Sequence, residues 1–215
     1  MKGIILSGGL GTRLHPLTIS TSKQLLPVYD KPLIYYSLTT LMSIGIKDIL
    51  IITNKSQIPN FKKLLKNGTQ LGIKISYMSQ TKPNGIAESF IIGEKFIKNN
   101  PVALILGDNF FYGIGLDKNF AKYYKNIDGA LIFTYSVPNP NNFGVAVIKN
   151  NKIIKIVEKP KKIISDYAIT GLYFFDNKVV ELSKKLKPSK RGELEITDLL
   201  RKYQSYKNLN VEFLG

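Results

Sequence analysis

The chain has 215 residues, of which 44% are hydrophobic and 21% charged, and its 31 Lys and Arg against 15 Asp and Glu give a formal net charge of +16. This composition excludes collagen-like, coiled-coil and disordered proteins, and the length suits a domain with a sizeable core. The absence of Cys excludes disulfides, zinc–cysteine centres, iron–sulfur clusters and thiol nucleophiles.

The first 135 residues alternate between short apolar runs and amphipathic segments. The apolar runs are rich in aliphatic residues and bounded by polar turns, which predicts buried strands at 3–6, 49–53, 73–78, 102–106 and 131–135. The spacing of apolar side chains predicts helices at 32–44, 58–65, 86–97 and 116–124. Gly45, directly after the first of these helices, is a typical helix stop. Such alternation predicts an α/β fold with a mostly parallel sheet and helices on both faces.

The last 80 residues or so are richer in strand patterns. The runs 144–148 and 152–158 are joined by the short polar turn Lys149-Asn150-Asn151, which predicts a β-hairpin. A strand is predicted at 168–175, helices at 177–186 and 195–203, and a last apolar run at 211–214. No repeat or linker separates the two parts, so we expect a single domain over 1–215.

The positive charge does not by itself indicate a nucleic-acid-binding protein. The basic residues comprise 28 Lys and only 3 Arg, and Ile and Asn are also abundant, as expected from A/T-rich codons. Residues 1–148 carry 16 basic and 7 acidic side chains, and residues 149–215 carry 15 and 8, so the charge is evenly spread. Few arginines are available for bidentate contacts to bases. Nucleic-acid binding stays the alternative, and we expect no such partner.

The sequence shows no segment that would place the chain in a membrane. The apolar run at residues 4–6 is too short for a signal peptide and is followed by glycines. No stretch approaches the roughly 20 apolar residues that span a bilayer. We therefore expect a cytoplasmic protein with no membrane partner.

A glycine-rich loop, residues 7–14, directly follows the first predicted strand. Open α/β sheets bind ligands at the carboxyl ends of strands, and glycines let backbone N–H groups approach phosphate oxygens. The loop is neither G-x-G-x-x-G nor a Walker A motif. Arg13 ends the loop and Lys23 follows ten residues later, which suits the charge of a triphosphate. The alternative is a plain turn followed by a solvated lysine.

From this loop onward the chain resembles the sugar-nucleotide pyrophosphorylases. Two segments carry the resemblance, GGLGTRLHPLT at 8–18 and SKQLLPVYDKPLIYYSL at 22–38. Within the second, SKQLLPVYDKP is most similar to the sequence of the glucose-1-phosphate thymidylyltransferases. Matching blocks follow in order at 80–87, 106–113, 143–145, 157–160, 167–173 and 191–198. The resemblance implies a Rossmann-like nucleotidyltransferase fold, with a central mixed, mostly parallel sheet flanked by helices and a small β-rich sugar-binding part. It further implies a nucleotide-binding half at 1–135 and a sugar-phosphate-binding half at 136–215.

The resemblance also implies a reaction. dTTP and α-D-glucose 1-phosphate give dTDP-glucose and pyrophosphate with Mg²⁺, the first step towards dTDP-rhamnose and related sugars. Catalysis of this kind is mostly positioning and charge neutralisation around an in-line displacement. Thymine and uracil differ by one methyl group, worth only about 1–3 kcal/mol, so UTP or another sugar 1-phosphate is an alternative substrate. A nucleotide-binding remnant without turnover is a further alternative.

In the nucleotide site the resemblance implies backbone contacts to the phosphates and amide contacts to the base. The backbone contacts fall on Gly8, Gly9, Gly11 and Thr12, and the base contacts on Gln24, Gln80 and Gly85. Arg13 and Lys23 are implied to neutralise the departing β- and γ-phosphates. Asp108, just after the predicted strand at 102–106, is implied to bind Mg²⁺, although a turn-forming Asp would look the same.

The sugar-phosphate site is implied to come from both halves. The glucose pocket falls on Asn109, Gly144, Glu158, Ile169 and Tyr173. Glu158 is implied to accept sugar hydroxyls, and Lys159 to bind the phosphate and hold its oxygen for attack. Arg191 lies in a matching block near the site. An exposed strand end is the alternative for residues 158–160.

Members of this family continue beyond a Gly equivalent to Gly215 into a segment with Trp-Leu-Asp-Thr-Gly-Thr and then into helices. The Asp of that segment is a second metal carboxylate, and the helices form subunit contacts. We therefore expect the chain as given to lack this carboxylate, at a cost of about 3–4 kcal/mol or a hundred- to thousandfold in rate. The family forms homo-oligomers, and the resemblance leaves the oligomeric state of this chain open.

Overall fold

The computed structural model describes residues 1–113, 115, 118, 120, 122 and 127–214. The helices are α1 (Ile34–Ser43), α2 (Ile58–Leu65), α3 (Glu88–Ile92), α4 (Glu94–Ile97), α6 (Val179–Lys184) and α7 (Ile196–Ser205). The strands are β1 (Lys2–Ser7), β2 (Pro27–Val28), β3 (Lys31–Pro32), β4 (Asp48–Thr53), β5 (Lys74–Ser79), β6 (Val102–Leu106), β7 (Ala130–Ser136), β8 (Gly144–Lys149), β9 (Lys152–Glu158), β10 (Tyr167–Phe175) and β11 (Leu209–Leu214).

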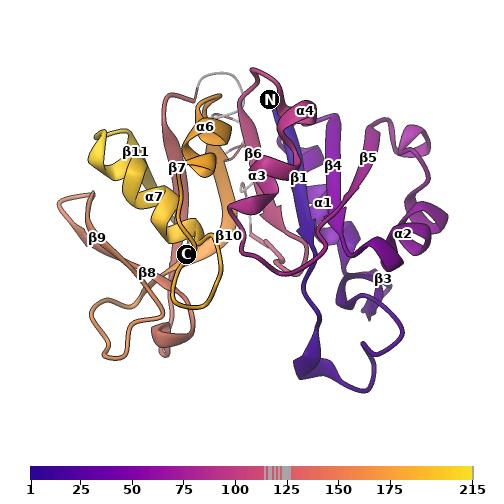
Figure 1. Cartoon of the computed structure of the whole chain (residues 1–215), viewed down its shortest axis with the longest axis horizontal. Coiled ribbons are helices and arrows are strands. Elements are labelled where there is room, and N and C mark those ends of the chain that lie inside the picture. The colour runs from indigo at the N-terminus through magenta and orange to yellow at the C-terminus, as the bar shows by residue number, and fades with distance from the viewer. Residues whose placement is uncertain (114, 116–117, 119, 121, 123–126, 215) are drawn as a thin grey trace.

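One twisted sheet runs through the whole molecule (Figure 1). Within the described residues it has nine strands, in the order β11-β7-β10-β6-β1-β4-β5, with β8 added to β10 and β9 to β8. β6, β1, β4 and β5 are mutually parallel, and β11 is parallel to β7. β10 runs antiparallel to β6, β7 and β8. This mixed, mostly parallel sheet confirms the predicted fold class.

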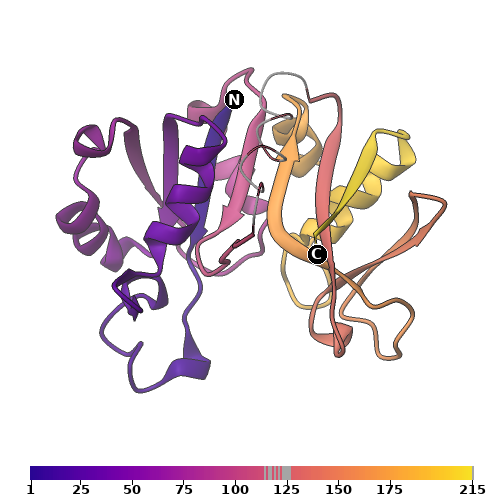
Figure 2. The ribbon, with the colours of Figure 1, turned by 180° about the vertical axis from the view of Figure 1, so that it is seen from behind.

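The sheet separates two hydrophobic cores because successive strand residues point to opposite faces. Ile4 packs in one core with Phe90 of α3, and Ile5 packs in the other with Ile34 of α1. α3, α4, α6 and α7 cover the first face in Figure 1, whereas Figure 2 shows α1 on the second face. Among the described residues, none of the helices is long and apolar enough to cross a lipid bilayer.

The parallel strands bring segments that are distant in sequence to one edge of the sheet. Ser7 pairs with Thr53, Thr53 with Ser79, and Leu6 with Leu106, so β1, β4, β5 and β6 end side by side. The residues that follow β1, β4, β5 and β6 are Gly8, Asn54, Gln80 and Gly107. The predicted nucleotide site therefore lies at this carboxyl edge, where open α/β sheets bind ligands.

The predicted strands and most predicted helices occur within a few residues of their expected bounds. The hairpin of β8 and β9 turns at Asn150 and Asn151, whose φ angles of 50° and 56° suit the primed turns of hairpins. The expected helix at 86–97 is instead two short helices divided at Gly93, where a Cβ would lie 3.0 Å from the Ser89 carbonyl oxygen. The helix expected at 32–44 starts at Ile34, because Lys31–Pro32 pairs with β2.

The helix expected at 116–124 is not tested, because that segment lies mostly outside the described residues.

Candidate active site

The glycine-rich loop after β1 is shaped by close contacts. A Cβ at Gly8 would lie 2.6 Å from Oε1 of Gln80, so a side chain there would displace that amide. Gly11 has φ +65°, a conformation that favours glycine, and its carbonyl accepts a hydrogen bond of 2.7 Å from the Thr18 hydroxyl. Gly9 has no neighbour within 4 Å of a Cβ position. Glycine therefore suits the close contact with the Gln80 side chain at Gly8 and the left-handed turn at Gly11.

A cavity of ≈ 280 Å³ beside this loop collects most of the predicted phosphate-binding residues; it is lined by Gly9, Gly11, Thr12, Arg13, Leu14, Lys23, Gln24 and Asp108. Lys23 Nζ donates to Asp108 Oδ2 at 3.0 Å, and both side chains are about one-third exposed (35% and 37%). Arg13 forms no ion pair within the described part of the chain. The cavity thus presents two cations and one carboxylate to a ligand.

Asp108 is the residue predicted to bind Mg²⁺. Besides its contact with Lys23, its Oδ1 accepts a hydrogen bond of 3.2 Å from the Asn109 amide. No cluster of three or more His, Asp or Glu was found in the described ranges. Mg²⁺ in proteins is commonly held by one or two carboxylates together with substrate phosphates. A single exposed carboxylate in a cavity that Arg13 and Lys23 also line meets that pattern.

The predicted base-binding amides are buried. Gln24 is 5% exposed, and its Oε1 accepts a hydrogen bond of 2.5 Å from the Ser22 hydroxyl. Gln80 is 3% exposed, and its Nε2 donates to the Gly85 carbonyl at 3.2 Å. Gln80 and Gly85 therefore lie together beside Gly8, as the sequence predicted for one site.

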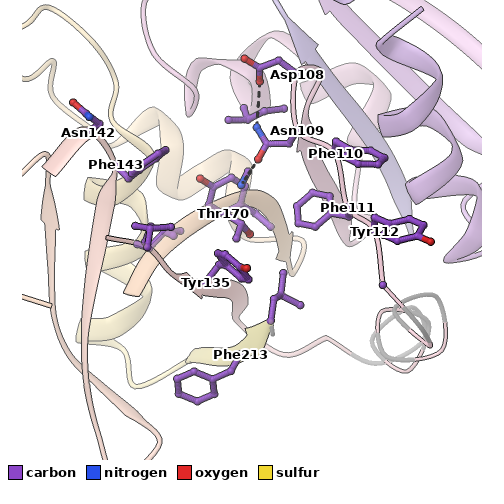
Figure 3. Close-up of a pocket in the computed structure, with 18 of the residues that line it drawn as sticks. Asp108, Asn109, Phe110, Phe111, Tyr112, Tyr135, Asn142, Phe143, Thr170 and Phe213 are labelled. Carbon is purple, nitrogen blue, oxygen red and sulfur yellow. Dashed lines mark hydrogen bonds between the residues drawn. The ribbon is translucent and has the colours of Figure 1, made fainter. Parts of the chain in front are cut away.

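A second cavity, of ≈ 230 Å³, collects the predicted sugar-phosphate residues; those that line it are Gly144, Glu158, Lys159, Ile169, Tyr173 and Arg191. Asn109 is the exception, since it lines a larger neighbouring cavity of ≈ 1030 Å³. There its Oδ1 accepts a hydrogen bond of 3.0 Å from the Gly171 amide, at an irregularity in β10 (Figure 3). The larger cavity also contains Arg13, Asp108 and Tyr173 and so connects the two smaller ones.

The sugar cavity is organised around Arg191. Its guanidinium donates to both carboxylate oxygens of the buried Glu195, with Nη2 at 2.9 and 2.8 Å and Nε at 3.0 Å. It also reaches Glu158 Oε1 at 3.3 Å and Glu193 Oε2 at 3.5 Å. Thr197 donates to the other oxygen of Glu158 at 3.2 Å. Arginine therefore joins three carboxylates in one network.

Burial raises the pKa of Glu158, and the nearby Glu195 carboxylate raises it further, while Arg191 and Lys159 oppose the shift. Burial likewise raises the pKa of the Tyr173 phenol at the same cavity, with a contribution from Glu158. A carboxylate that is costly to ionise holds its charge best when hydroxyl donors surround it. Hydroxyl donors around Glu158 would lower the free-energy cost of its ionisation.

Lys159 has a strained backbone. Its φ is +40°, which is uncommon for a residue other than glycine, and the following Pro160 normally favours extended conformations at this position. The Lys159 N–H donates to the Phe143 carbonyl at 3.0 Å, which fixes the chain end of β9 against the loop before β8. Such strain is typical of functional sites, where the surrounding structure maintains it.

Comparison with known proteins decides the family. The profile of the nucleotidyl transferase family matches residues 2–215. A glucose-1-phosphate thymidylyltransferase from Neisseria meningitidis is 53% identical over 100% of this chain and 75% of its own length, and one from Mycolicibacterium smegmatis is 50% identical over the same shares. The chain belongs to the glucose-1-phosphate thymidylyltransferase family of nucleotidyl transferases.

Solved structures of nucleotidyl transferases show the same fold. A protein assigned as a glucose-1-phosphate thymidylyltransferase from Bacillus anthracis, crystallised with a sucrose, has a TM-score of 0.93 and 42% identity over 100% of this chain and 87% of its own. A UDP-glucose pyrophosphorylase in complex with UDP-glucose has a TM-score of 0.85 and 26% identity, over 100% and 90%. This thymidylyltransferase-family chain thus spans about three-quarters of the curated relatives named above.

Three residues that contact the predicted site residues had no assigned role in the sequence. Glu195 accepts hydrogen bonds from Arg191, and Thr197 donates one to Glu158. Glu88 accepts a hydrogen bond from the side-chain amide of Gln80. The signal for Glu195 was present, because Arg191 is one of only three arginines and is followed closely by Glu193 and Glu195. No comparable signal marks Glu88, whose partner is eight residues away across a loop.

Proposed function

We propose that this chain transfers a thymidylyl group from dTTP to α-D-glucose 1-phosphate, forming dTDP-glucose and pyrophosphate. The observation that carries the proposal is the pair of cavities joined by a third. The first cavity is lined by glycine backbone and two cations, and the second contains a carboxylate network suited to hydroxyl groups. Residues of both cavities also line the third, connecting cavity.

In the proposed reaction a phosphate oxygen of glucose 1-phosphate attacks the α-phosphorus of dTTP. The bond between the α-phosphorus and the bridging oxygen to the β-phosphate breaks, and pyrophosphate leaves with the electron pair. The attacking phosphate is already anionic, so no protein base has to remove a proton. Catalysis then consists of alignment and charge neutralisation.

Arg13 and Lys23 neutralise the leaving pyrophosphate. They line the same cavity as the loop glycines. The planar guanidinium of an arginine can bind two phosphate oxygens at once, and the ammonium of a lysine acts as a compact positive charge. Asp108 is the residue that would hold Mg²⁺, which supplies further charge neutralisation on the phosphates when bound. The first half of the chain, residues 1–135, is thus the proposed nucleotide-binding half.

Residues 136–215 are the proposed sugar-phosphate-binding half. Glu158 accepts hydrogen bonds from glucose hydroxyls, and Lys159 binds the phosphate and directs its oxygen towards the nucleotide. Arg191 lies within reach of Glu158 in the same cavity and supplies a second positive charge. The strained backbone of Lys159 supports this assignment, because it fixes the starting direction of the side chain.

The test is the release of pyrophosphate from dTTP and glucose 1-phosphate in the presence of Mg²⁺. Arg13→Ala and Lys159→Ala should each lower kcat/KM by about a hundred- to thousandfold, the usual cost of losing one preorganised charge stabiliser. Lys162→Ala is the matched control, since this exposed lysine lies three residues from Lys159 and outside the cavity lining. If Arg13→Ala or Lys159→Ala keeps the parent's activity, the role assigned to that residue is wrong.

A matrix of nucleoside triphosphates against sugar 1-phosphates would identify the natural pair. The structural likeness to a UDP-glucose pyrophosphorylase makes UTP the competing nucleotide. Calorimetric binding of dTTP without any pyrophosphate release would instead indicate a nucleotide-binding protein without turnover.

A further inference from the structure

One nitrogen of the Arg191 guanidinium faces more acceptors than it has hydrogens. Nη2 contacts both carboxylate oxygens of Glu195, at 2.9 and 2.8 Å, and one oxygen each of Glu158 and Glu193, at 3.3 and 3.5 Å. This nitrogen carries two N–H groups, so the four oxygens compete for two donors. The distances assign these donors chiefly to Glu195 and leave Glu158 with a long contact.

Glu195 is itself fixed in its place against the arginine. It directly precedes α7 and is 6% exposed. Its Oε1 accepts hydrogen bonds from Arg191 Nε at 3.0 Å and from the Ser189 hydroxyl at 2.7 Å. The same hydroxyl accepts the Arg191 backbone N–H at 3.2 Å. The Nε and Nη2 edge of the guanidinium therefore lies along this carboxylate, the paired geometry in which arginine binds carboxylates most strongly.

Glu158 is only partly paired by comparison. Its Oε1 receives the long contact from Arg191, and its Oε2 accepts a hydrogen bond of 3.2 Å from the Thr197 hydroxyl. Its side chain is 22% exposed and lines the sugar cavity. A full charge-assisted bond would be about half an ångström shorter than the present contact. A small movement of the guanidinium would therefore turn this contact into a complete ion pair.

We propose that Glu195 is a positioning residue that holds the Arg191 guanidinium back from Glu158 and thereby keeps Glu158 open to the hydroxyl groups of the sugar. The inference rests on the proposed function, in which Glu158 accepts hydrogen bonds from glucose. A carboxylate in a full ion pair with arginine must lose that partner before hydroxyl groups can bind to the same lone pairs. With Glu195 present, the hydroxyl groups replace one long contact instead. Glu195 thus acts on sugar affinity through Arg191.

The experiment measures the dissociation constants of glucose 1-phosphate and dTTP by calorimetry for the parent, Glu195→Met, Arg191→Met and the double variant. Methionine has about the length of glutamate, and the released Arg191 side chain, 40% exposed, stays in contact with water. In Glu195→Met, Arg191 pairs with Glu158, so the Kd of glucose 1-phosphate should rise about fivefold, the effect of one partly exposed ion pair that the sugar must break. The Kd of dTTP should stay unchanged, because the nucleotide cavity shares no residue with this network.

The decisive readout is the sign of the Arg191 effect. With Glu195 present, Arg191→Met removes a positive charge from the sugar-phosphate cavity and should weaken binding of glucose 1-phosphate. In Glu195→Met the same substitution also removes the ion pair that blocks Glu158, so it should strengthen binding. A role of Glu195 confined to folding would give the same weakening in both backgrounds, since the two effects would then add.

Steady-state kinetics and one control variant complete the test. For Glu195→Met, KM for glucose 1-phosphate should rise about fivefold with little change in kcat, because a saturating sugar phosphate displaces the guanidinium from Glu158. Asp198→Asn is the matched control on α7. This carboxylate pairs with Arg201, three residues away, and lies outside the cavity lining, so the Kd of glucose 1-phosphate should not change.

Circular dichroism melting shows whether Glu195→Met is folded. If it is not, Glu195→Gln replaces it in the same cycle. Glutamine keeps the shape and one acceptor but loses the charge, so the two remaining carboxylates attract Arg191 more strongly than the amide does.

The proposal is overturned if the folded Glu195 variant binds glucose 1-phosphate as tightly as the parent. It is also overturned if Arg191→Met weakens binding equally with and without Glu195, or if Asp198→Asn weakens binding as much as Glu195→Met. A parent that binds both substrates but releases no pyrophosphate would contradict the proposed reaction alone, and the dissociation constants would still decide the role of Glu195.

Discussion

In the nucleotide cavity the positive charges face few carboxylates, whereas in the sugar cavity a single arginine is surrounded by them. Lys23 pairs with Asp108 through a contact that is about one-third exposed. Arg191, by contrast, contacts Glu158, Glu193 and Glu195, and Glu195 is only 6% exposed. The first cavity is therefore prepared for a highly charged ligand, and the second is largely neutralised by its own residues.

The ion pairs of the two cavities therefore contribute differently to folding stability. An exposed ion pair contributes about 0–1 kcal/mol to folding, so the nucleotide side can rearrange around phosphates at little cost. A buried carboxylate that loses its partner destabilises the fold far more. We therefore expect substitutions in the nucleotide cavity to affect catalysis, and substitutions in the sugar network to affect both catalysis and stability.

The largest expected effect is on catalysis at Lys23. Lys23→Ala should lower kcat/KM for pyrophosphate release about a hundred- to thousandfold while changing the free energy of unfolding by less than about 1 kcal/mol. Lys31→Ala is the control, since its ion pair with Asp30 is similarly exposed but lies on β3, away from the cavities. Steady-state kinetics and urea unfolding measure the two quantities. A large loss of stability in Lys23→Ala would show that the Lys23–Asp108 ion pair stabilises the fold.

The second effect is on stability at Arg191. Arg191→Met leaves the buried Glu195 without its charged partner, and we expect a loss of about 1–3 kcal/mol in the free energy of unfolding, with a raised KM for glucose 1-phosphate. Arg201→Met is the control, because its partner Asp198 is about one-third exposed, although the substitution also removes the bond from Arg201 Nε to the Ile156 carbonyl. If both variants lose the same stability by urea unfolding, the sugar network has no special structural role.

The third effect depends on pH and concerns Glu158. Its raised pKa means that the folded state binds the proton more tightly than the unfolded chain does, so this group lowers stability as pH rises from the ordinary value of 4.5 through the raised one. Glu158→Gln should therefore be at least as stable as the parent at pH 7, and the difference should vanish below about pH 4, where both side chains are neutral. The variant should nevertheless have a raised KM for glucose 1-phosphate.

Urea unfolding at several pH values tests this sign. A variant that is less stable than the parent at pH 7, by an amount that does not shrink on acidification, would show that Glu158 stabilises the fold through its charge. That result would remove the expected conflict between stability and sugar binding at this residue.

The smallest expected effect distinguishes two neighbouring glycines of the loop. Gly8→Ala forces a Cβ against Gln80 Oε1 and should raise KM for dTTP several-fold, whereas Gly9→Ala meets nothing within 4 Å and should change it less than about twofold. Equal effects of the two variants on KM would show that the loop backbone, rather than the contact with Gln80, limits nucleotide binding.

The sequence by itself determined the local elements and the chemistry of the loop. Hydrophobic spacing marked the strands and helices because burial of one face imposes a period of two or 3.6 residues. Glycines after β1, and Asn150 with Asn151 between β8 and β9, marked turns because few other residues adopt those conformations. The ordered sequence blocks identified the family and predicted site residues, most of which line the two cavities, from Gly9 to Arg191.

Only the tertiary structure decided which distant residues act on one another. The antiparallel insertion of β10 between β6 and β7 brings Gly171 to Asn109, and no local pattern encodes that strand order. Arg191 reaches Glu158 from 33 residues away, and Glu88 accepts a hydrogen bond from the Gln80 amide. Such contacts depend on the direction of single hydrogen bonds, which periodicity does not specify, because it records which face a residue occupies and not which atom it meets.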